Sequence, residues 1–167
     1  MDLLTLEDVL LNQVNGFERS QASTSMALPL IAEAAWVTGK WEYLNVHLDR
    51  YHDAAPGDFN VGIGRALLAL KEDDGQRFLD ALHILRQDTA KSLTKSNTMS
   101  LQTCHEAMLK LHAITEIELL GGQAPGSMPD KPTMMSTLDQ RLGIMGAFLS
   151  DKEYLLGIRR ATMQLSK

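Results

Sequence analysis

Cysteine and aromatic residues are scarce in this sequence, and each shortage excludes a class of protein. The single cysteine, Cys104, cannot form an internal disulfide, which excludes a disulfide-stapled secreted domain and fits a reducing compartment. Aromatic residues make up only 5% of the chain, and its nine methionines suit packing between helices better than a β-sandwich. We expect Cys104 to be a small buried side chain rather than a reactive thiol.

Long apolar runs and positive charge are also in short supply. No stretch of about eighteen apolar residues is present and no signal peptide is evident, so we expect neither a membrane span nor secretion. The 16 Lys and Arg are outnumbered by 21 Asp and Glu, which gives a net charge of −5. The only adjacent basic pair is Arg159-Arg160, so we expect no direct contact with nucleic acid.

Side chains that could catalyse a reaction or bind a metal form no recognised pattern. Histidines of one predicted helix never stand three or four residues apart, the spacing at which two imidazoles share a face. We therefore expect surface or capping histidines at His47, His52, His83, His105 and His112. The chain also lacks the His-Arg-Asp and Asp-Phe-Gly motifs of a kinase. We predict no catalytic, cofactor-binding or metal-binding residue, and that this chain is not an enzyme.

Other residues that could suggest a site have a structural interpretation. Gly62-x-Gly64 is too short for a phosphate-binding loop and is more typical of close helix packing. Trp36 and Trp41 flank a helix turn and are expected in the core rather than in a ligand platform. Three glutamates lack an accompanying base or nucleophile, and we expect them to be solvated or ion-paired: Glu106, Glu116 and Glu118.

Apolar residues recur at helical spacing along the whole chain, which predicts an all-α fold. The longest pattern, Met99 to Leu120, has no Gly or Pro and would span roughly 33 Å at ~1.5 Å per residue. Its expected buried stripe is Leu101, Cys104, Met108 and Leu111, widened by Ala107, Ile114 and Ile117. Further helices are expected at residues 5–19, 26–38, 40–51, 60–73, 76–91, 136–149 and 151–165.

Turn and capping residues predict where these helices end. Gly39 closes the helix at 26–38, and Gly121-Gly122 closes the long helix. Ser96-Asn97 is the expected N-cap of the long helix, and Ser150 that of the last one. Residues 20–25 indicate a polar connector, with Pro29 in the first turn that follows, and residues 121–135 indicate a flexible loop. In the helix at 76–91 the expected buried side chains are Phe78, Leu79, Leu82, Ile84 and Leu85.

An aromatic residue followed by Leu recurs near the start of helices that follow a turn. Tyr43-Leu44 and Phe78-Leu79 lie thirty-five residues apart, and Tyr154-Leu155 repeats the pair in the last hairpin. A period near ~34 residues is typical of tetratricopeptide (TPR) repeats. We predict one helical-repeat domain over residues 1–167, a TPR-like α-solenoid of about eight antiparallel helices. A non-repeating helical bundle is the alternative, because antiparallel helices with short loops look similar in sequence.

Five stretches over about residues 26–167, nearly the whole chain, stand out as motifs. They are Glu33-Ala34-Ala35-Trp36 with Gly39-Lys40-Trp41, Phe78 to Arg86, Leu111 to Glu118, Gln140-Arg141-Leu142, and Asp151 to Ala161. In order and spacing they resemble segments of the FAT domain of ATR-type checkpoint kinases, members of the phosphatidylinositol-3-kinase-related protein kinase family. Tyr154 stands where that family commonly has Pro, and Leu138 where a Trp often precedes the Arg.

The resemblance implies a non-catalytic piece of a very large nuclear Ser/Thr kinase that acts in the DNA-damage and replication checkpoint. It implies that this scaffold packs on the kinase domain and regulates it. The implied partners are the kinase domain and remaining solenoid of the same polypeptide, with a regulatory subunit or second protomer, and no cofactor.

A free-standing TPR-like adaptor that binds a peptide or partner helix is the alternative function. A carboxylate-clamping groove would need exposed Asn, Lys and Arg on the inner helices, and residues 26–38 contain none. Whichever function holds, we expect a charge introduced at Leu82 or Leu111 to unfold the chain.

Overall fold

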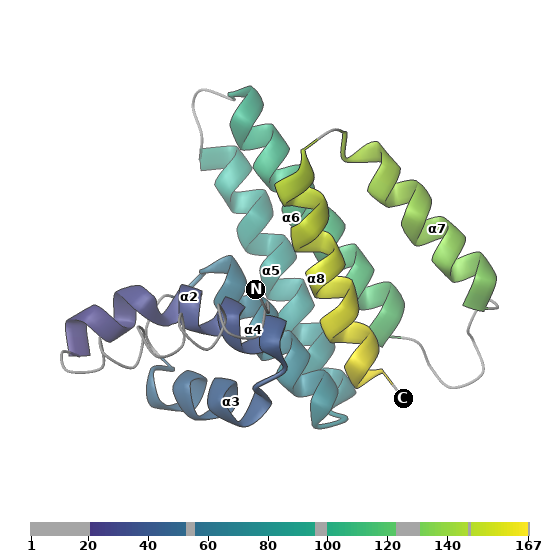
Figure 1. The fold of residues 1–167 in the computed structure, drawn as a ribbon. Coiled ribbons are helices and arrows are strands. Elements are labelled where there is room, and N and C mark those ends of the chain that lie inside the picture. The colour runs from purple at the N-terminus through teal and green to yellow at the C-terminus, as the bar shows by residue number, and fades with distance from the viewer. Residues whose placement is uncertain (1–20, 53–55, 96–99, 123–130, 147, 167) are drawn as a thin grey trace, which may run out of the picture.

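The described part of the chain is entirely helical. The computed structural model describes residues 21–52, 56–95, 100–122, 131–146 and 148–166, and no strand occurs in them. The predicted helix at 5–19 lies outside these ranges. The helices are α2 (Gln21–Thr38), α3 (Trp41–Arg50), α4 (Phe59–Lys71), α5 (Gly75–Lys95), α6 (Leu101–Gly121), α7 (Lys131–Ile144) and α8 (Leu149–Leu165), as Figure 1 shows. The predicted all-α class is confirmed.

Capping residues set several of these boundaries. Gly39 has φ +72°, a backbone conformation that glycine adopts without steric cost, and α2 ends beside it as predicted. At the start of α4, Asp58 Oδ1 accepts a hydrogen bond of 3.0 Å from the Val61 N–H. Ser100 does the same for Thr103 at the start of α6, at 3.1 Å, so the predicted cap at Ser96-Asn97 is wrong.

Four predicted boundaries need correction. α2 begins at Gln21 rather than after a connector, which places Pro29 inside the helix, and α5 continues to Lys95. α7 occupies Lys131–Ile144 instead of 136–149, because Pro132 is tolerated in the first turn, where helix N–H groups have no partner. α8 begins at Leu149 with Phe148 as its cap residue, so Ser150 is not the N-cap. The remainder of the predicted loop, residues 123–130, lies outside the described ranges.

Neighbouring helices pack on one another from α2 to α6, and α8 returns across them. α2 contacts α3 and α4, α4 contacts α5, and α5 contacts α6. α8 lies mainly against α6 and also contacts α4 and α2, as Figure 1 shows. α7 contributes Met134 and Leu138 to a separate small cluster with Leu120 of α6. The last helix therefore closes the core that the earlier helices begin.

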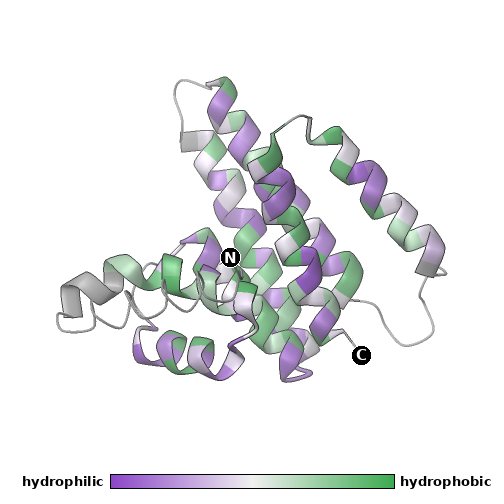
Figure 2. Ribbon diagram, viewed as in Figure 1, coloured by the Kyte–Doolittle hydropathy of each residue, from purple (hydrophilic) through white to green (hydrophobic). Residues whose placement is uncertain are grey.

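The main core contains Trp36, Phe78, Leu82 and Ile114, all fully buried, so the prediction that Trp36 lies in the core is confirmed. Figure 2 shows hydrophobic and hydrophilic residues mixed along α3. Its buried residues are Leu44, His47 and Leu48. Trp41 is partly buried against the same core.

Among the described residues, no helix is long and apolar enough to cross a lipid bilayer.

Glycines of α4 allow its close packing on two neighbours. A Cβ atom added to Gly62 would lie 2.4 Å from Leu85 Cδ2 of α5, so Leu85 would have to move to accept any side chain there. One added to Gly64 would lie 3.3 Å from Leu44 Cδ1 of α3. The interpretation of Gly62-x-Gly64 as a close-packing signal is confirmed.

The predicted buried face of α6 is only partly right. Ala107, Ile114 and Ile117 are buried as expected. Cys104 is only partly buried, so the expected burial of its side chain is wrong, and Leu101, Met108 and Leu111 are 92%, 38% and 41% exposed. α6 carries apolar residues on two sides, so periodicity could not tell which side would meet α5 and α8. The same correction applies to α5, whose buried side includes Phe78, Leu82 and Leu85 whereas Leu79 and Ile84 are exposed.

Candidate functional site

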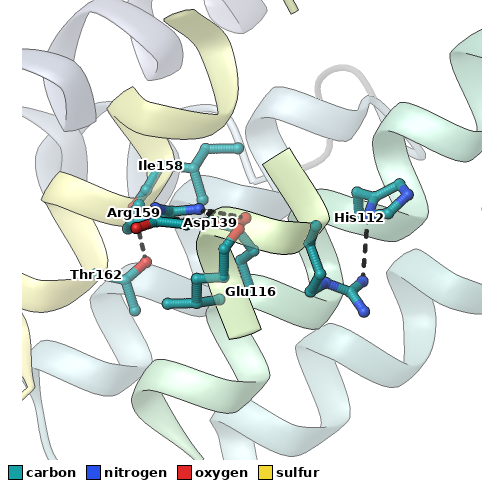
Figure 3. A network of polar contacts seen from close by, with 8 residues as sticks. His112, Glu116, Asp139, Ile158, Arg159 and Thr162 are labelled. Atoms are coloured by element: carbon teal, nitrogen blue, oxygen red, sulfur yellow. Dashed lines mark hydrogen bonds and ion pairs between the residues drawn. The ribbon is translucent and has the colours of Figure 1, made fainter. Parts of the chain in front are cut away.

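The buried guanidinium of Arg159 joins three helices. Arg159 of α8 donates Nε–H and Nη2–H to the two carboxylate oxygens of Glu116 on α6, at 3.1 and 3.0 Å. Its Nη1–H meets Asp139 Oδ1 at 2.9 Å and its Nη2–H meets the Leu138 carbonyl at 2.9 Å, both on α7. Figure 3 shows Arg159, Glu116 and Asp139 drawn together. We call Arg159, Glu116 and Asp139 the Arg159 cluster.

Burial makes this cluster a strong constraint on the packing. Arg159 is 5% exposed and Glu116 is fully buried, while the Asp139 side chain is largely exposed. The hydrogen bonds from Glu116 raise the pKa of Arg159 above its ordinary value, although burial alone would lower it. Bidentate pairing of this kind orients both side chains and keeps two buried charges compensated.

A second chain of polar contacts ties the other end of α8 to α4 and α2. The Tyr154 hydroxyl donates to Asn60 Oδ1 at 2.7 Å, and Asn60 Nδ2 donates to Glu33 Oε2 at 2.9 Å. Burial, together with the nearby negative charge of Glu33, raises the pKa of Tyr154 well above its usual range, so the hydroxyl stays a donor. The ring of Trp36 meets the Tyr154 ring edge-on at 6.0 Å between centroids.

Two further pairs link α6 to its other neighbours. Arg86 of α5 forms an ion pair with Glu118 of α6. Arg141 of α7 donates Nη2–H to His112 Nδ1 of α6 at 3.2 Å, and Figure 3 shows His112 apart from the Arg159 cluster. α6 thus has a polar contact to α5, α7 and α8.

The histidines and glutamates singled out in the sequence are dispersed among different partners. His47 is buried, with Nδ1 2.9 Å from the Tyr43 carbonyl, so the expectation of a surface or capping histidine is wrong there. His105 Nε2 lies 2.6 Å from Asp151, and His83 Nε2 lies 2.8 Å from the side chain of Gln87. In the described ranges no three His, Cys, Asp or Glu side chains are grouped as metal ligands.

Glu116 is ion-paired, which was one of the two expected states, and it is buried rather than solvated. In the sequence Arg159 stands out only as half of a basic pair, and no pattern marks Asp139. A signal for the pairing of Glu116 with Arg159 is nevertheless present. Glu116 lies between Ala113, Ile117 and Leu120 on one helix face, and Arg159 lies between Leu155, Ile158 and Thr162. Opposite charges within two apolar stripes indicate a buried pair.

A family comparison identifies this helical arrangement. The model of the FAT domain matches residues 28–167, most of the chain. This chain belongs to the FAT domain family. No curated protein and no solved structure matched it in the other two comparisons. The FAT domain is a non-catalytic helical scaffold region of phosphatidylinositol-3-kinase-related kinase proteins, and this chain is a FAT-domain segment.

In this FAT-domain segment, the stretches that resemble the kinase family are joined to one another by the polar contacts above. The stretch from Leu111 to Glu118 supplies His112, Glu116 and Glu118, which meet Arg141, Arg159 and Arg86 of three other stretches. Glu33 meets the last stretch through Asn60 and Tyr154. The residues behind the resemblance act as connectors between helices, consistent with a scaffold.

His112 makes the free energy of unfolding of this FAT-domain segment depend on pH. Burial and the charge of Arg141 lower the pKa of His112, although Glu116 acts in the opposite direction. The unfolded chain takes up the proton near the ordinary pKa of 6.5, and the folded chain only at lower pH. Stability from this group is therefore complete above the unfolded pKa and is lost as the pH falls through the folded pKa.

We expect a His112→Gln variant to lose less free energy of unfolding than the parent chain between about pH 7.5 and about pH 5. Urea denaturation at a series of pH values measures the free energy of unfolding of each protein. Subtracting one pH profile from the other removes the contribution of the carboxylates, which titrate in both proteins. Parallel pH profiles for the two proteins would contradict the prediction.

Proposed function

We propose that this segment is part of the non-catalytic scaffold of a large nuclear Ser/Thr kinase of the DNA-damage and replication checkpoint. The observation that carries the proposal is the FAT domain match over residues 28–167. The ATR-type motifs in family order support the checkpoint class, because they occur throughout the matched region. In this role the chain forms a TPR-like α-solenoid, packs on the kinase domain of the same polypeptide and regulates it.

Neighbour-to-neighbour packing from α2 to α6 supports the solenoid form of this proposal, whereas the return of α8 onto α2 and α4 departs from strict stacking. Stacked hairpins make a stiff, curved body whose two faces can contact different partners. The buried Arg159 cluster would hold α6, α7 and α8 in one orientation, so that a displacement at one end is passed on as movement of a rigid unit.

The mass of the natural polypeptide tests the proposal first. An antibody against this segment should detect, in native nuclear extract, a band far above the 18.5 kDa of this chain. The immunoprecipitate should phosphorylate a Ser/Thr substrate. A band near 18.5 kDa would instead support the alternative, a free-standing TPR-like adaptor that binds a peptide or partner helix.

Cross-linking of the same immunoprecipitate tests the regulatory contact. Lys40 and Lys71 are exposed and lie on or beside different helices. If the scaffold packs on the kinase domain, amine cross-links from the segment's lysines should reach kinase-domain peptides. Cross-links confined to the segment and other helical peptides would contradict the proposed contact with the kinase domain.

A further inference from the structure

α6 presents a second apolar face to the outside, opposite the one that it buries. Nine residues, two and a half helical turns, separate Met108 from Ile117, so their side chains leave the helix on opposite sides. Ile117 is fully buried in the core, whereas Met108 and Leu111 are 38% and 41% exposed. A helix that is apolar on both sides is typical of one that is covered on both sides.

This outer face forms the floor of a shallow groove of about 390 Å³. Leu93 of α5 and Arg141 of α7 also line the groove. We call it the α6 groove, lined by Leu93, Cys104, Met108, Leu111, His112 and Arg141, with Ala107 and Thr115. From Cys104 to Thr115 it follows α6 for about three turns, a length that suits a short helix.

The rim of the α6 groove carries positive charge without a compensating acid. None of the residues that line it is Asp or Glu, although the whole chain has a net charge of −5. Arg141 donates one hydrogen bond to His112, and its buried Nε has no acceptor in the part of the chain that the structure describes. A carboxylate arriving at the guanidinium of Arg141 would supply the opposite charge.

We propose that the α6 groove docks an amphipathic helix of a partner protein, with its apolar side chains over Met108 and Leu111 and a carboxylate on Arg141. The inference goes beyond the scaffold role, because it specifies the chemistry of a partner. The groove between α3, α4 and α5 differs in character, since its lining mixes acids with bases: Asp49, Asp58, Asp80 and Asp88 with Arg65 and Arg77. The α6 groove, by contrast, contains Arg141 without an acid in its lining.

Cys104 is a built-in reporter, because it is the only cysteine of the chain and it lines the α6 groove. The probe is a helical peptide of about eighteen residues, with leucines three and four residues apart along one face and glutamates beside them. A control peptide carries lysine in place of every glutamate. At about ten times the peptide's dissociation constant only about a tenth of the protein is free, so Cys104 alkylation should slow about tenfold.

Arg141→Gln should weaken binding of the acidic peptide about tenfold, since a hydrogen-bonded charge pair is lost. Arg50→Gln is the matched control, because Arg50 is exposed on α3 and does not line the groove. It should leave protection of Cys104 unchanged. Leu111→Gln should weaken binding of the acidic peptide without removing charge.

The comparison of the two peptides on the parent chain tests the proposal even if a variant fails to fold. Equal protection by the acidic and the basic peptide, or no protection by either, would overturn it. Two results for the free protein would also overturn it by assigning another occupant. Protection that rises with protein concentration would indicate a second copy, and protection that is lost on deleting residues 1–20 would indicate the chain's own N-terminal segment.

Discussion

Replacing Arg159 with Met is expected to lower the free energy of unfolding by about 3–5 kcal/mol. The reason is the partner that remains, because Glu116 is fully buried and both its carboxylate oxygens accept their hydrogen bonds from Arg159. Asp139 contributes little to the loss, since its side chain is largely exposed and regains water. Urea denaturation followed by circular dichroism measures the change.

A double variant separates the penalty of an unpaired charge from the loss of packing. Arg159→Met combined with Glu116→Leu removes both buried charges and keeps apolar volume, and buried pairs replaced in this way are often neutral or stabilising. We expect the double variant to recover most of the stability lost in the single one. Equal losses in the two variants would mean that packing, rather than an uncompensated Glu116, dominates.

Replacing Leu82 with Glu is expected to abolish folding at room temperature. Leu82 is fully buried on α5 within the main core, so the substitution removes an apolar contact and buries an unpaired carboxylate. Loss of a buried Leu side chain alone costs about 2–5 kcal/mol. With total stabilities of about 5–15 kcal/mol, the added desolvation of a charge leaves no folded population. The helical circular dichroism signal should fall to that of an unfolded chain.

Leu111→Glu is the matched control, since it introduces the same charge on the neighbouring helix. Its side chain is 41% exposed, so the carboxylate can keep its water and the fold should persist. The sequence predicted unfolding at both positions, and the structure separates them. A folded Leu82→Glu chain, or an unfolded Leu111→Glu chain, would contradict this assignment of the two faces.

The contrast between Leu82 and Leu111 shows what the sequence could predict. On α5, the three positions Phe78, Leu82 and Leu85 are buried as predicted. On α6 the apolar residues surround the helix, and the choice of face depends on where α5 and α8 lie. That choice is tertiary information, which a periodicity within one helix does not contain.

Helix boundaries were predictable where a local group determines them. Gly39 ends α2 through its own backbone preference. The start of α8 has no side-chain cap, because Phe148 occupies the cap position, and the nearby Ser150 is a capping residue type that does not act as the cap. α7 begins at Lys131. The sequence predicted a later start because Pro132 is typical of a loop.

The polar connectors were only partly predictable. Glu116 and Arg159 each stand within an apolar stripe, but their pairing joins residues 43 apart in the sequence. Tyr154 meets Asn60 across 94 residues, and nothing in either local sequence indicates the other. The family resemblance brought the right stretches to attention, and the structure shows which stretch meets which.

The return of α8 across α2 and α4 also dictates an order of events during synthesis. Local contacts let the hairpins of α2 to α5 form as they leave the ribosome. Trp36 and Glu33, however, face Tyr154, and Glu116 faces Arg159, so these groups stay uncovered until the final seventeen-residue helix has emerged. A chain that terminates before Leu149 would expose an apolar seam and an unpaired carboxylate, the features that chaperones and proteases act on.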